Sequence, residues 1–296
     1  MGEPLVRADG SPGADIAHVM THVMAAAQAA GDLILQMQAA GLRAVAGKSS
    51  EIDLVTEADV AAEQAIRAAL QQTYPAYGFW GEESNEPPSG TDFFWVVDPI
   101  DGTTNFANGL AFYAVNIALN RGEETLLGVT LELPARRLYW AIAGQGAYER
   151  LPNGADRRLQ VNRSSQLARA LLSTGFPYHR TEHEDNNLRE FNYFLAHAQG
   201  VRCMGSAAMD LVNVARGALA GYWEGWLNPW DAAAGALLVR EAGGLVTDYS
   251  GQPWRLRSKT LIASNGQPAL HAALVEGIRS ARNGLAARLL PAAEGA

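Results

Sequence analysis

Cysteine is nearly absent from this sequence, because Cys203 is the only one in 296 residues. A single thiol excludes an internal disulfide framework and is typical of proteins of the reducing cytoplasm. No apolar run reaches the roughly 18 residues that a membrane span requires. No basic segment followed by an apolar stretch marks a secretory signal at the N-terminus. These absences predict a cytoplasmic protein without a membrane segment.

Blocks of positive charge are also missing. The formal net charge is −8 at pH 7, with 23 Lys and Arg against 31 Asp and Glu, and no segment is rich in Lys or Arg. A broad electrostatic footprint for nucleic acid is therefore not expected. If the substrate is anionic, positive charge has to be supplied locally, and a bound metal ion would supply it.

Apolar residues are plentiful, since 48% of the chain is hydrophobic and only 18% is charged. That composition is sufficient for a sizeable core. There is no internal repeat, low-complexity tract or linker long enough to separate independent domains. We expect a flexible N-terminus over residues 1–13, a single domain over 14–280 and a C-terminal tail over 281–296. Within the domain we expect two closely packed halves, 14–165 and 166–280.

Hydrophobic spacing predicts an α+β fold in packed layers. In the first half it indicates two helices, at 14–40 and 57–72, joined by a loop over 41–50. A mostly antiparallel sheet is expected to follow, with strands at 78–80, 93–97, 114–118, 126–133, 138–143 and 147–150. In the second half strands alternate with helices: strands at 171–174, 222–224 and 245–247, and helices at 184–198, 207–215 and 230–241.

The most informative stretch runs from Trp95 to Phe106. Its apolar, β-prone start ends in two acids three residues apart, Asp98 and Asp101, followed by glycine, two threonines and an asparagine. This pattern is typical of a strand that enters a tight turn presenting carboxylates and N-cap residues. Like charges so close together are costly unless a cation neutralises them, and Mg²⁺ is the natural cation for oxygen ligands. A plain Asp-Gly turn is the simpler alternative for a bare fragment, but the whole string favours a metal site.

Three further acidic clusters each have a structural explanation when taken alone. Glu82 and Glu83 follow a predicted strand and would ordinarily be a solvated surface pair. Asp231 falls in the first turn of an Ala-rich helix, where an acid favours the helix dipole. Thr56 and Asp59 stand at a predicted helix start and are equally suited to capping it.

Together, and in this order, the four segments resemble the inositol monophosphatase family of Mg²⁺-dependent, lithium-sensitive phosphatases. The segment from Asp98 to Phe106 looks like the family's first signature, and that from Trp230 to Gly244 looks like its second. The stretches 53–59 and 81–84 match as well, and the resemblance extends from about Ile16 to Leu274. It implies a layered αβαβα sandwich of the sugar-phosphatase type. It also implies Mg²⁺-dependent hydrolysis of inositol 1-phosphate or a similar sugar-alcohol phosphate.

The resemblance also implies a set of metal ligands. Glu82, Asp98 and the backbone carbonyl of Ile100 would hold one Mg²⁺ ion, and Asp98 would bridge to a second ion held also by Asp101 and Asp231. Two ions per subunit are expected, with three as the alternative. Glu82 and Asp98 are accordingly counted as catalytic. Backbone oxygens at tight turns are ordinary ligands for such hard cations.

Catalytic and phosphate-binding roles follow from the same resemblance. Thr103 would orient an attacking water, and Asp59 would hydrogen-bond Thr103 and help accept the proton. Gly102 and Thr103 would offer backbone N–H groups to the phosphate. Lys48, in the expected loop, would add positive charge nearby, although a solvated surface lysine is its simpler interpretation.

Substrate selection is assigned to a separate set of residues. Glu224, seven residues before Asp231, is expected to bind ring hydroxyls, with Ala207 bordering the ring. Asp231 is also expected to contact the substrate. Asn108 and Asn116 depart from the residues common in the family, which places fine specificity in doubt rather than catalysis.

Several alternatives stay open at this stage. Histidinol-phosphate or fructose-1,6-bisphosphate hydrolysis would use the same scaffold, and the region of Arg180 is the only hint of a second phosphate site. A nucleotide 3′-phosphatase should carry an adenine-binding insertion, which the sequence lacks. A non-catalytic role linked to RNA and transcription is the rival from another class. Family members are homodimers, so a homodimer acting on a small phosphate ester is our expectation.

Overall fold

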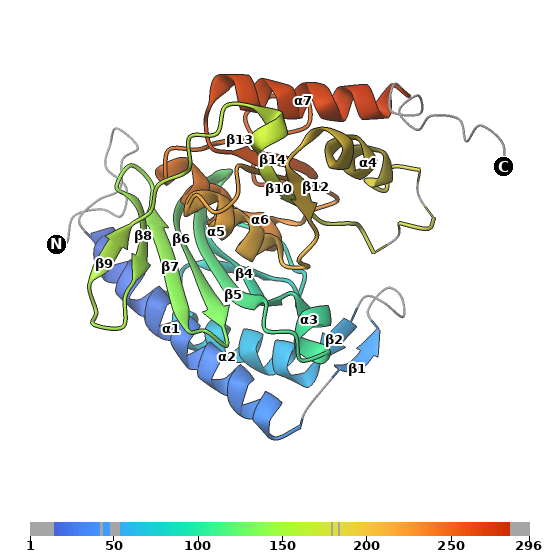
Figure 1. Cartoon of the computed structure of the whole chain (residues 1–296). Helices are drawn as coiled ribbons and strands as arrows, with labels where there is room; N and C mark the ends of the chain where they lie inside the picture. Colours follow the sequence, from blue (N-terminus) through green and yellow to red (C-terminus); the bar gives the residue numbers. More distant parts are fainter. Residues whose placement is uncertain (1–14, 42–43, 48–53, 179, 183, 285–296) are drawn as a thin grey trace.

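The computed structural model describes residues 15–41, 44–47, 54–178, 180–182 and 184–284. The chain forms five layers in the order helix, sheet, helix, sheet, helix (Figure 1), which confirms the predicted αβαβα sandwich. The N-terminal segment expected to be flexible, Lys48 and the last twelve residues lie outside the described residues. Among the helices that are described, none is both long enough and apolar enough to cross a membrane.

The first two layers belong to the N-terminal half. Helices α1 (Asp15–Ala39) and α2 (Glu57–Thr73) cover one face of a seven-stranded sheet with the order β3-β4-β5-β6-β7-β8-β9. Only the β3–β4 pair in this sheet is parallel, so the prediction of a mostly antiparallel sheet is confirmed. Its strands are β3 (Gly78–Gly81), β4 (Phe93–Asp101), β5 (Tyr113–Arg121), β6 (Glu124–Leu133), β7 (Arg137–Ile142), β8 (Gly146–Arg150) and β9 (Asp156–Arg158).

The middle layer is a pair of helices enclosed on both sides, α5 (Ala207–Ala215) and α6 (Pro229–Glu241). Nearly every residue of α6 is buried, which explains why its sequence is apolar on all faces rather than amphipathic. Small residues let it lie directly on the sheet, because a Cβ added at Gly128 of β6 would come within 2.7 Å of the Ala234 Cα. The Ala-rich segment is therefore a packing requirement of this layer.

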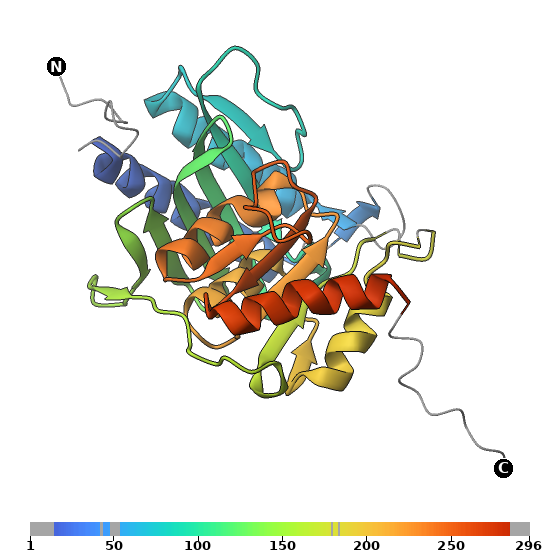
Figure 2. The ribbon, with the colours of Figure 1, turned by 90° about the horizontal axis from the view of Figure 1, so that it is seen from above.

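The second sheet and its outer helices complete the sandwich. The strand order is β11 (Gly200–Arg202), β10 (Leu171–Thr174), β12 (Gly221–Gly225), β14 (Thr260–Ser264) and β13 (Leu245–Thr247). Helices α4 (Leu188–His197) and α7 (Pro268–Arg282) pack side by side on its outer face, and Figure 2 shows α7 lying across this end of the molecule.

Several predicted boundaries need correction. The helix expected over 184–198 begins only at Leu188, because Asn187 adopts a left-handed conformation with φ of 67°. The segment expected as a loop over 41–50 contains strand β1 (Ala44–Gly47), paired with β2 (Leu54–Thr56). Helices α3 (Thr103–Ala107) and α7 and strands β9, β11 and β14 were not predicted. Of these, β9 and β11 are three-residue edge strands without an alternating apolar pattern.

A buried histidine joins α7 to the second sheet. His271 places Nδ1 2.8 Å from the Ser264 hydroxyl and Nε2 3.0 Å from the Thr247 hydroxyl. Burial lowers the pKa of His271 because it disfavours the charged imidazolium.

Acidification is expected to destabilise the fold through His271. The unfolded chain takes up a proton near pH 6.5 while the folded chain still resists it, so this contribution to stability is lost as pH falls below about 6.5. Thermal unfolding midpoints of wild type and His271→Gln at pH 7.5 and 5.5 would test this. The variant should lose less stability on acidification than wild type, whereas His18→Gln, at an exposed histidine, should behave like wild type. Equal losses in wild type and His271→Gln would contradict the assignment.

Candidate active site

A pocket of about 870 Å³ opens where the ends of β3, β4 and β12 meet the starts of α3, α5 and α6. It is lined by nearly all of the residues predicted for the site: Glu82, Asp98, Ile100, Asp101, Gly102, Thr103, Ala207, Glu224 and Asp231. Asp59 is fully buried beside this wall and contacts Thr103. The structure thus brings together predicted site residues that are up to 172 positions apart in the chain, from Asp59 to Asp231. Only Lys48 is not placed, because it lies outside the described residues.

An irregularity in β4 brings its two acids to the same place. Asp98 pairs with Asn116 and Asp101 with Ala114, so three steps along β4 correspond to two along β5. In a regular strand residues 98 and 101 would face opposite sides, and the extra residue of a bulge reverses one of them. Both carboxylates consequently reach the pocket, with the carbonyl of Ile100 between them.

Glycine is required at position 102. Gly102 has φ of 96°, and a Cβ there would come within 3.0 Å of the Gly205 carbonyl oxygen. The residue turns the chain from β4 directly into α3. Because α3 has only five residues, its dipole is small, and any attraction for an anion must come from individual N–H groups.

Thr103 and Asp59 form a buried pair. The Thr103 hydroxyl lies 3.1 Å from Asp59 Oδ1 and 3.0 Å from the Ile100 carbonyl oxygen. The other oxygen of Asp59 accepts hydrogen bonds from the Thr56 N–H, at 2.9 Å, and from the Thr56 hydroxyl. Thr56 and Asp59 are the reciprocal capping box of α2. The cap fixes one oxygen of Asp59 and directs the other toward Thr103.

The acidic side chains of the pocket repel one another. Burial raises the pKa of Asp98 well above its usual range, and the nearby carboxylates of Glu82, Asp101 and Asp231 raise it further. One buried oxygen of Asp98, Oδ1, has no hydrogen-bond partner. Within the described residues, no three His, Cys, Asp or Glu side chains converge closely enough to form a ready-made metal cage. The carboxylates surround the pocket with negative charge that a hard cation would neutralise.

Asp101 connects the two halves of the molecule. Its Oδ2 accepts hydrogen bonds from the Ser206 hydroxyl and, at 2.8 Å, from the Ala208 N–H, and its Oδ1 accepts from the Ala207 N–H at 3.3 Å. A β4 side chain thereby caps the start of α5. Burial raises the pKa of Asp101 to about 6, even though the bonds from Ser206 and Ala208 favour the charged form.

Asp231 also serves a helix start. It accepts a hydrogen bond from the Asn228 N–H at 2.6 Å in the capping box of α6. Behind it, the Asn116 side-chain amide donates to the Trp230 carbonyl at 2.7 Å and its oxygen accepts from Thr130. Burial and the charge of Glu82 raise the pKa of Asp231 well above its usual range. Asn116, noted as a departure from the family pattern, therefore supports the segment that carries Asp231.

Glu224 lines the same pocket from strand β12. Burial raises the pKa of Glu224 to about 7, while the hydrogen bond from the Tyr222 hydroxyl favours the charged form. The carboxylate rests on Gly175, where an added Cβ would lie 2.1 Å from Glu224 Oε2. The absence of a side chain at residue 175 is therefore a condition for the observed position of Glu224.

Sequence reasoning gave no role in the site to Lys259, Asn105 or Glu63 and noted Arg180 only as a hint. Arg180 and Lys259 are the basic side chains among the described residues that line this pocket. The Asn105 amide donates to the carbonyls of Phe112 and Met204 at 2.7 and 2.8 Å, which ties α3 to the segment before α5. Glu63, on α2, holds the turn that contains Glu82. Of the residues without a predicted role, Glu63 could have been found from the sequence, because it stands four residues after Asp59 and therefore lies on the same face of the predicted helix.

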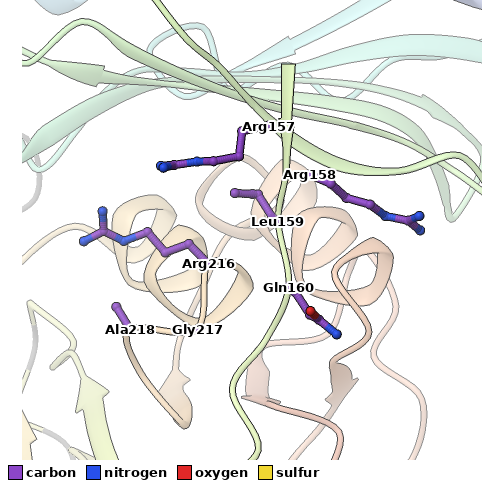
Figure 3. Close-up of a pocket in the computed structure, with 7 residues that line it drawn as sticks. All are labelled: Arg157, Arg158, Leu159, Gln160, Arg216, Gly217 and Ala218. Carbon is purple, nitrogen blue, oxygen red and sulfur yellow. The ribbon is translucent and has the colours of Figure 1, made fainter. Parts of the chain in front are cut away.

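A second pocket, of about 490 Å³, shares no residue with the first (Figure 3). Three arginines stand among its lining residues, Arg157, Arg158 and Arg216. Arg157 is paired with Glu149, and Arg216 donates through Nε to Asn213 at 2.8 Å. Figure 3 shows Arg158 directed away from the other two. The acids and the Thr–Asp pair belong to the first pocket, which is therefore the candidate active site.

Comparison with known proteins identifies the family to which the chain belongs. A solved structure of an inositol monophosphatase from Anabaena (Nostoc) superposes with a TM-score of 0.79 at 32% identity, covering 90% of this chain and 97% of that one. The fold and the family match together define a phosphatase, a phosphoric monoester hydrolase. Residues 15–283 match the model of the inositol monophosphatase family, and the chain belongs to that family.

Two curated relatives carry different names. The Caulobacter vibrioides inositol-1-monophosphatase is 39% identical over 238 residues, which cover 79% of this chain and 90% of the relative. The Pseudomonas aeruginosa Nus factor SuhB is 40% identical over 246 residues, which cover 81% of this chain and 89% of the relative. Similarity alone therefore does not select between these two names for this chain.

Proposed function

We propose that this chain is a Mg²⁺-dependent phosphatase that hydrolyses inositol 1-phosphate by attack of an activated water. One observation carries the proposal: the four carboxylates proposed as metal ligands line the same pocket as Thr103, and Thr103 contacts the buried Asp59. The name of the Caulobacter relative supports the choice of substrate. We further propose that the protein is a cytoplasmic homodimer, as its family resemblance suggests.

The residues of the pocket fit the ion. Glu82, Asp98 and the Ile100 carbonyl would hold one Mg²⁺, and Asp98, Asp101 and Asp231 a second. The unpartnered Asp98 Oδ1 and the mutual repulsion of the acids are the features that favour a cation. When bound, Mg²⁺ supplies positive charge for the phosphate and lowers the pKa of a coordinated water.

The chain's own residues then manage the proton. When the Thr103 hydroxyl donates to Asp59 Oδ1, its oxygen can still accept a hydrogen bond from an attacking water in the pocket that Thr103 lines. Asp59 receives the displaced proton, and its second oxygen stays fixed by Thr56. No side chain has to act as a nucleophile, so no covalent phosphoenzyme is expected.

Recognition of the leaving group is assigned to Glu224, Ala207 and Asp231. A carboxylate that accepts hydrogen bonds from two vicinal hydroxyls orients the substrate ring more strictly than an apolar wall does. Tyr222 donates to one oxygen of Glu224 and so limits its rotation. The alternative substrate with most support is a sugar bisphosphate, because Arg180 and Lys259 line the same pocket and would suit a second phosphate.

Gly175→Ala is expected to alter substrate selection with little change in stability. The new methyl group would displace the flexible end of Glu224 rather than backbone, and residue 175 has no unusual φ. KM for inositol 1-phosphate should rise by about tenfold, in line with the loss of one hydrogen bond to a charged group, while kcat changes less. Steady-state kinetics and a thermal unfolding midpoint would measure both. An unchanged KM would show that Glu224 does not select the substrate.

Phosphate release from a substrate panel tests the proposed function. Inositol 1-phosphate, histidinol phosphate, fructose 1,6-bisphosphate and adenosine 3′,5′-bisphosphate would each be assayed with Mg²⁺ and with EDTA. Mg²⁺-dependent preference for inositol 1-phosphate would support the proposal. Preference for another ester would keep the mechanism and overturn the substrate. No hydrolysis by folded protein that binds Mg²⁺ would favour the non-catalytic role suggested by the relative named Nus factor SuhB.

A further inference from the structure

We propose that Glu63 is a positioning residue that holds the turn carrying Glu82 in the geometry needed to bind Mg²⁺. The inference rests on the proposed metal site and extends it to a carboxylate that does not line the pocket. Glu63 is 5% exposed and lies on α2. A buried carboxylate is expensive unless it accepts several hydrogen bonds or faces a cation, and the contacts of Glu63 meet both conditions.

The first step is the backbone of the turn after β3. The N–H of Glu82 donates to the Val97 carbonyl at 3.0 Å, and that of Asn85 donates to the Gly81 carbonyl at 2.9 Å. The N–H groups of Glu83 and Ser84 lie between them in the turn. Glu63 accepts both, from Glu83 at 2.8 Å through Oε2 and from Ser84 at 3.0 Å through Oε1. One side chain therefore completes the hydrogen bonding of this turn.

The second step is the space made for this carboxylate. A Cβ at Gly81 would lie 2.1 Å from Glu63 Oε2, so any larger residue would force the carboxylate out of its place. Gly81 immediately precedes Glu82. The absence of a side chain at Gly81 therefore leaves room for the Glu63 carboxylate next to the residue that precedes the proposed metal ligand Glu82.

The third step is the cation beside it. Arg67, one helical turn after Glu63, donates to the Ser84 hydroxyl at 2.8 Å and lies 3.9 Å from Glu63 Oε1. Its guanidinium stacks over the Phe79 ring at 4.3 Å. These contacts give the turn a second attachment to α2 and partly compensate the charge of Glu63.

Consequently one face of α2 serves both sides of the site. Asp59 reaches Thr103, and Glu63, four residues later, reaches the turn of Glu82. In metal sites, partners behind the ligands set ligand orientation, and their loss typically weakens metal binding or activity by about tenfold to a hundredfold. We expect an effect of this size on Mg²⁺ affinity when Glu63 is replaced.

The test measures Mg²⁺ binding by calorimetry without substrate, on the full chain, for wild type, Glu63→Gln and Gly81→Ala. In Glu63→Gln an amide donor faces one of the two N–H groups, and in Gly81→Ala the carboxylate is displaced while every charge is kept. Both should raise the Mg²⁺ dissociation constant about tenfold to a hundredfold. Glu57→Gln, an exposed glutamate on the same helix, should leave it unchanged. Thermal unfolding in EDTA reports whether each variant is folded.

Unchanged Mg²⁺ affinity in folded Glu63→Gln would overturn the inference. An effect in Glu63→Gln without one in Gly81→Ala would also overturn it, because the charge rather than the position of Glu63 would then be responsible. If Glu63→Gln does not fold, Gly81→Ala decides alone. Wild-type protein that binds Mg²⁺ but hydrolyses no ester would overturn the proposed function and leave this inference intact. Wild-type protein that binds no Mg²⁺ would overturn both.

Discussion

Asp98→Asn is expected to lower kcat/KM for phosphate release by more than about a hundredfold, since even partners behind a metal ligand are worth tenfold to a hundredfold. Asp98 would be a ligand of both ions, and the asparagine side chain would offer one neutral oxygen in place of the two charged carboxylate oxygens. The same variant should raise the thermal unfolding midpoint in EDTA. Its amide removes the repulsion with Glu82, Asp101 and Asp231 that acts on Asp98 in the metal-free protein.

The two readouts should move in opposite directions, which a merely misfolded variant would not reproduce. Asp92→Asn serves as the matched control, because Asp92 is exposed at the start of the region that leads into β4. That control should retain wild-type activity and midpoint. Hydrolysis by Asp98→Asn at near wild-type rates with Mg²⁺ would contradict the assignment of residue 98 as a metal ligand.

Thr103→Ala is expected to reduce kcat about a hundredfold to ten-thousandfold, the range for loss of a positioned proton-transfer partner. The alanine removes the hydroxyl that lies between Asp59 Oδ1 and the pocket. Mg²⁺ affinity should stay close to wild type, because the Thr103 side chain is not among the proposed ligands. This separates the effect from that of Asp98→Asn.

Thr103→Ser provides the rescue. Serine keeps the hydroxyl and loses only the methyl group, so it should recover most of the lost activity. Steady-state phosphate release and calorimetric Mg²⁺ titration on all three proteins give the comparison. A serine variant as inactive as the alanine variant would mean that Thr103 acts by filling space.

The acids of the pocket could be predicted from sequence more readily than their arrangement. Asp98 and Asp101 stand in a distinctive string, but the spacing of a regular strand would place them on opposite faces. Only the irregularity in the β4–β5 pairing brings both to the pocket, and register shifts leave little trace in a single sequence. The pairing of Asp59 with Thr103, 44 residues away, likewise rested on family resemblance.

Regular elements with strong periodicity were predicted well, and those whose formation depends on partners were not. The boundaries of α5 and β10 agree with the prediction: α5 is apolar except at Asp210 and Asn213, and β10 begins with two leucines. Strand β11 has only three residues, Gly-Val-Arg, and pairs with the edge of β10. Helix α7 was not predicted although Leu270, Leu274 and Ile278 follow helical spacing after Pro268.

The double role of Asp101 limits the substitutions that this position could accept during evolution. Its carboxylate caps α5 from the opposite half of the molecule and is also a proposed ligand of the ion. A substitution at residue 101 would therefore alter catalysis and the joint between the halves in a single event. A lineage that abandoned hydrolysis for a binding role would still be obliged to keep this aspartate. Its retention in a relative is thus a poor guide to whether that relative is still an enzyme.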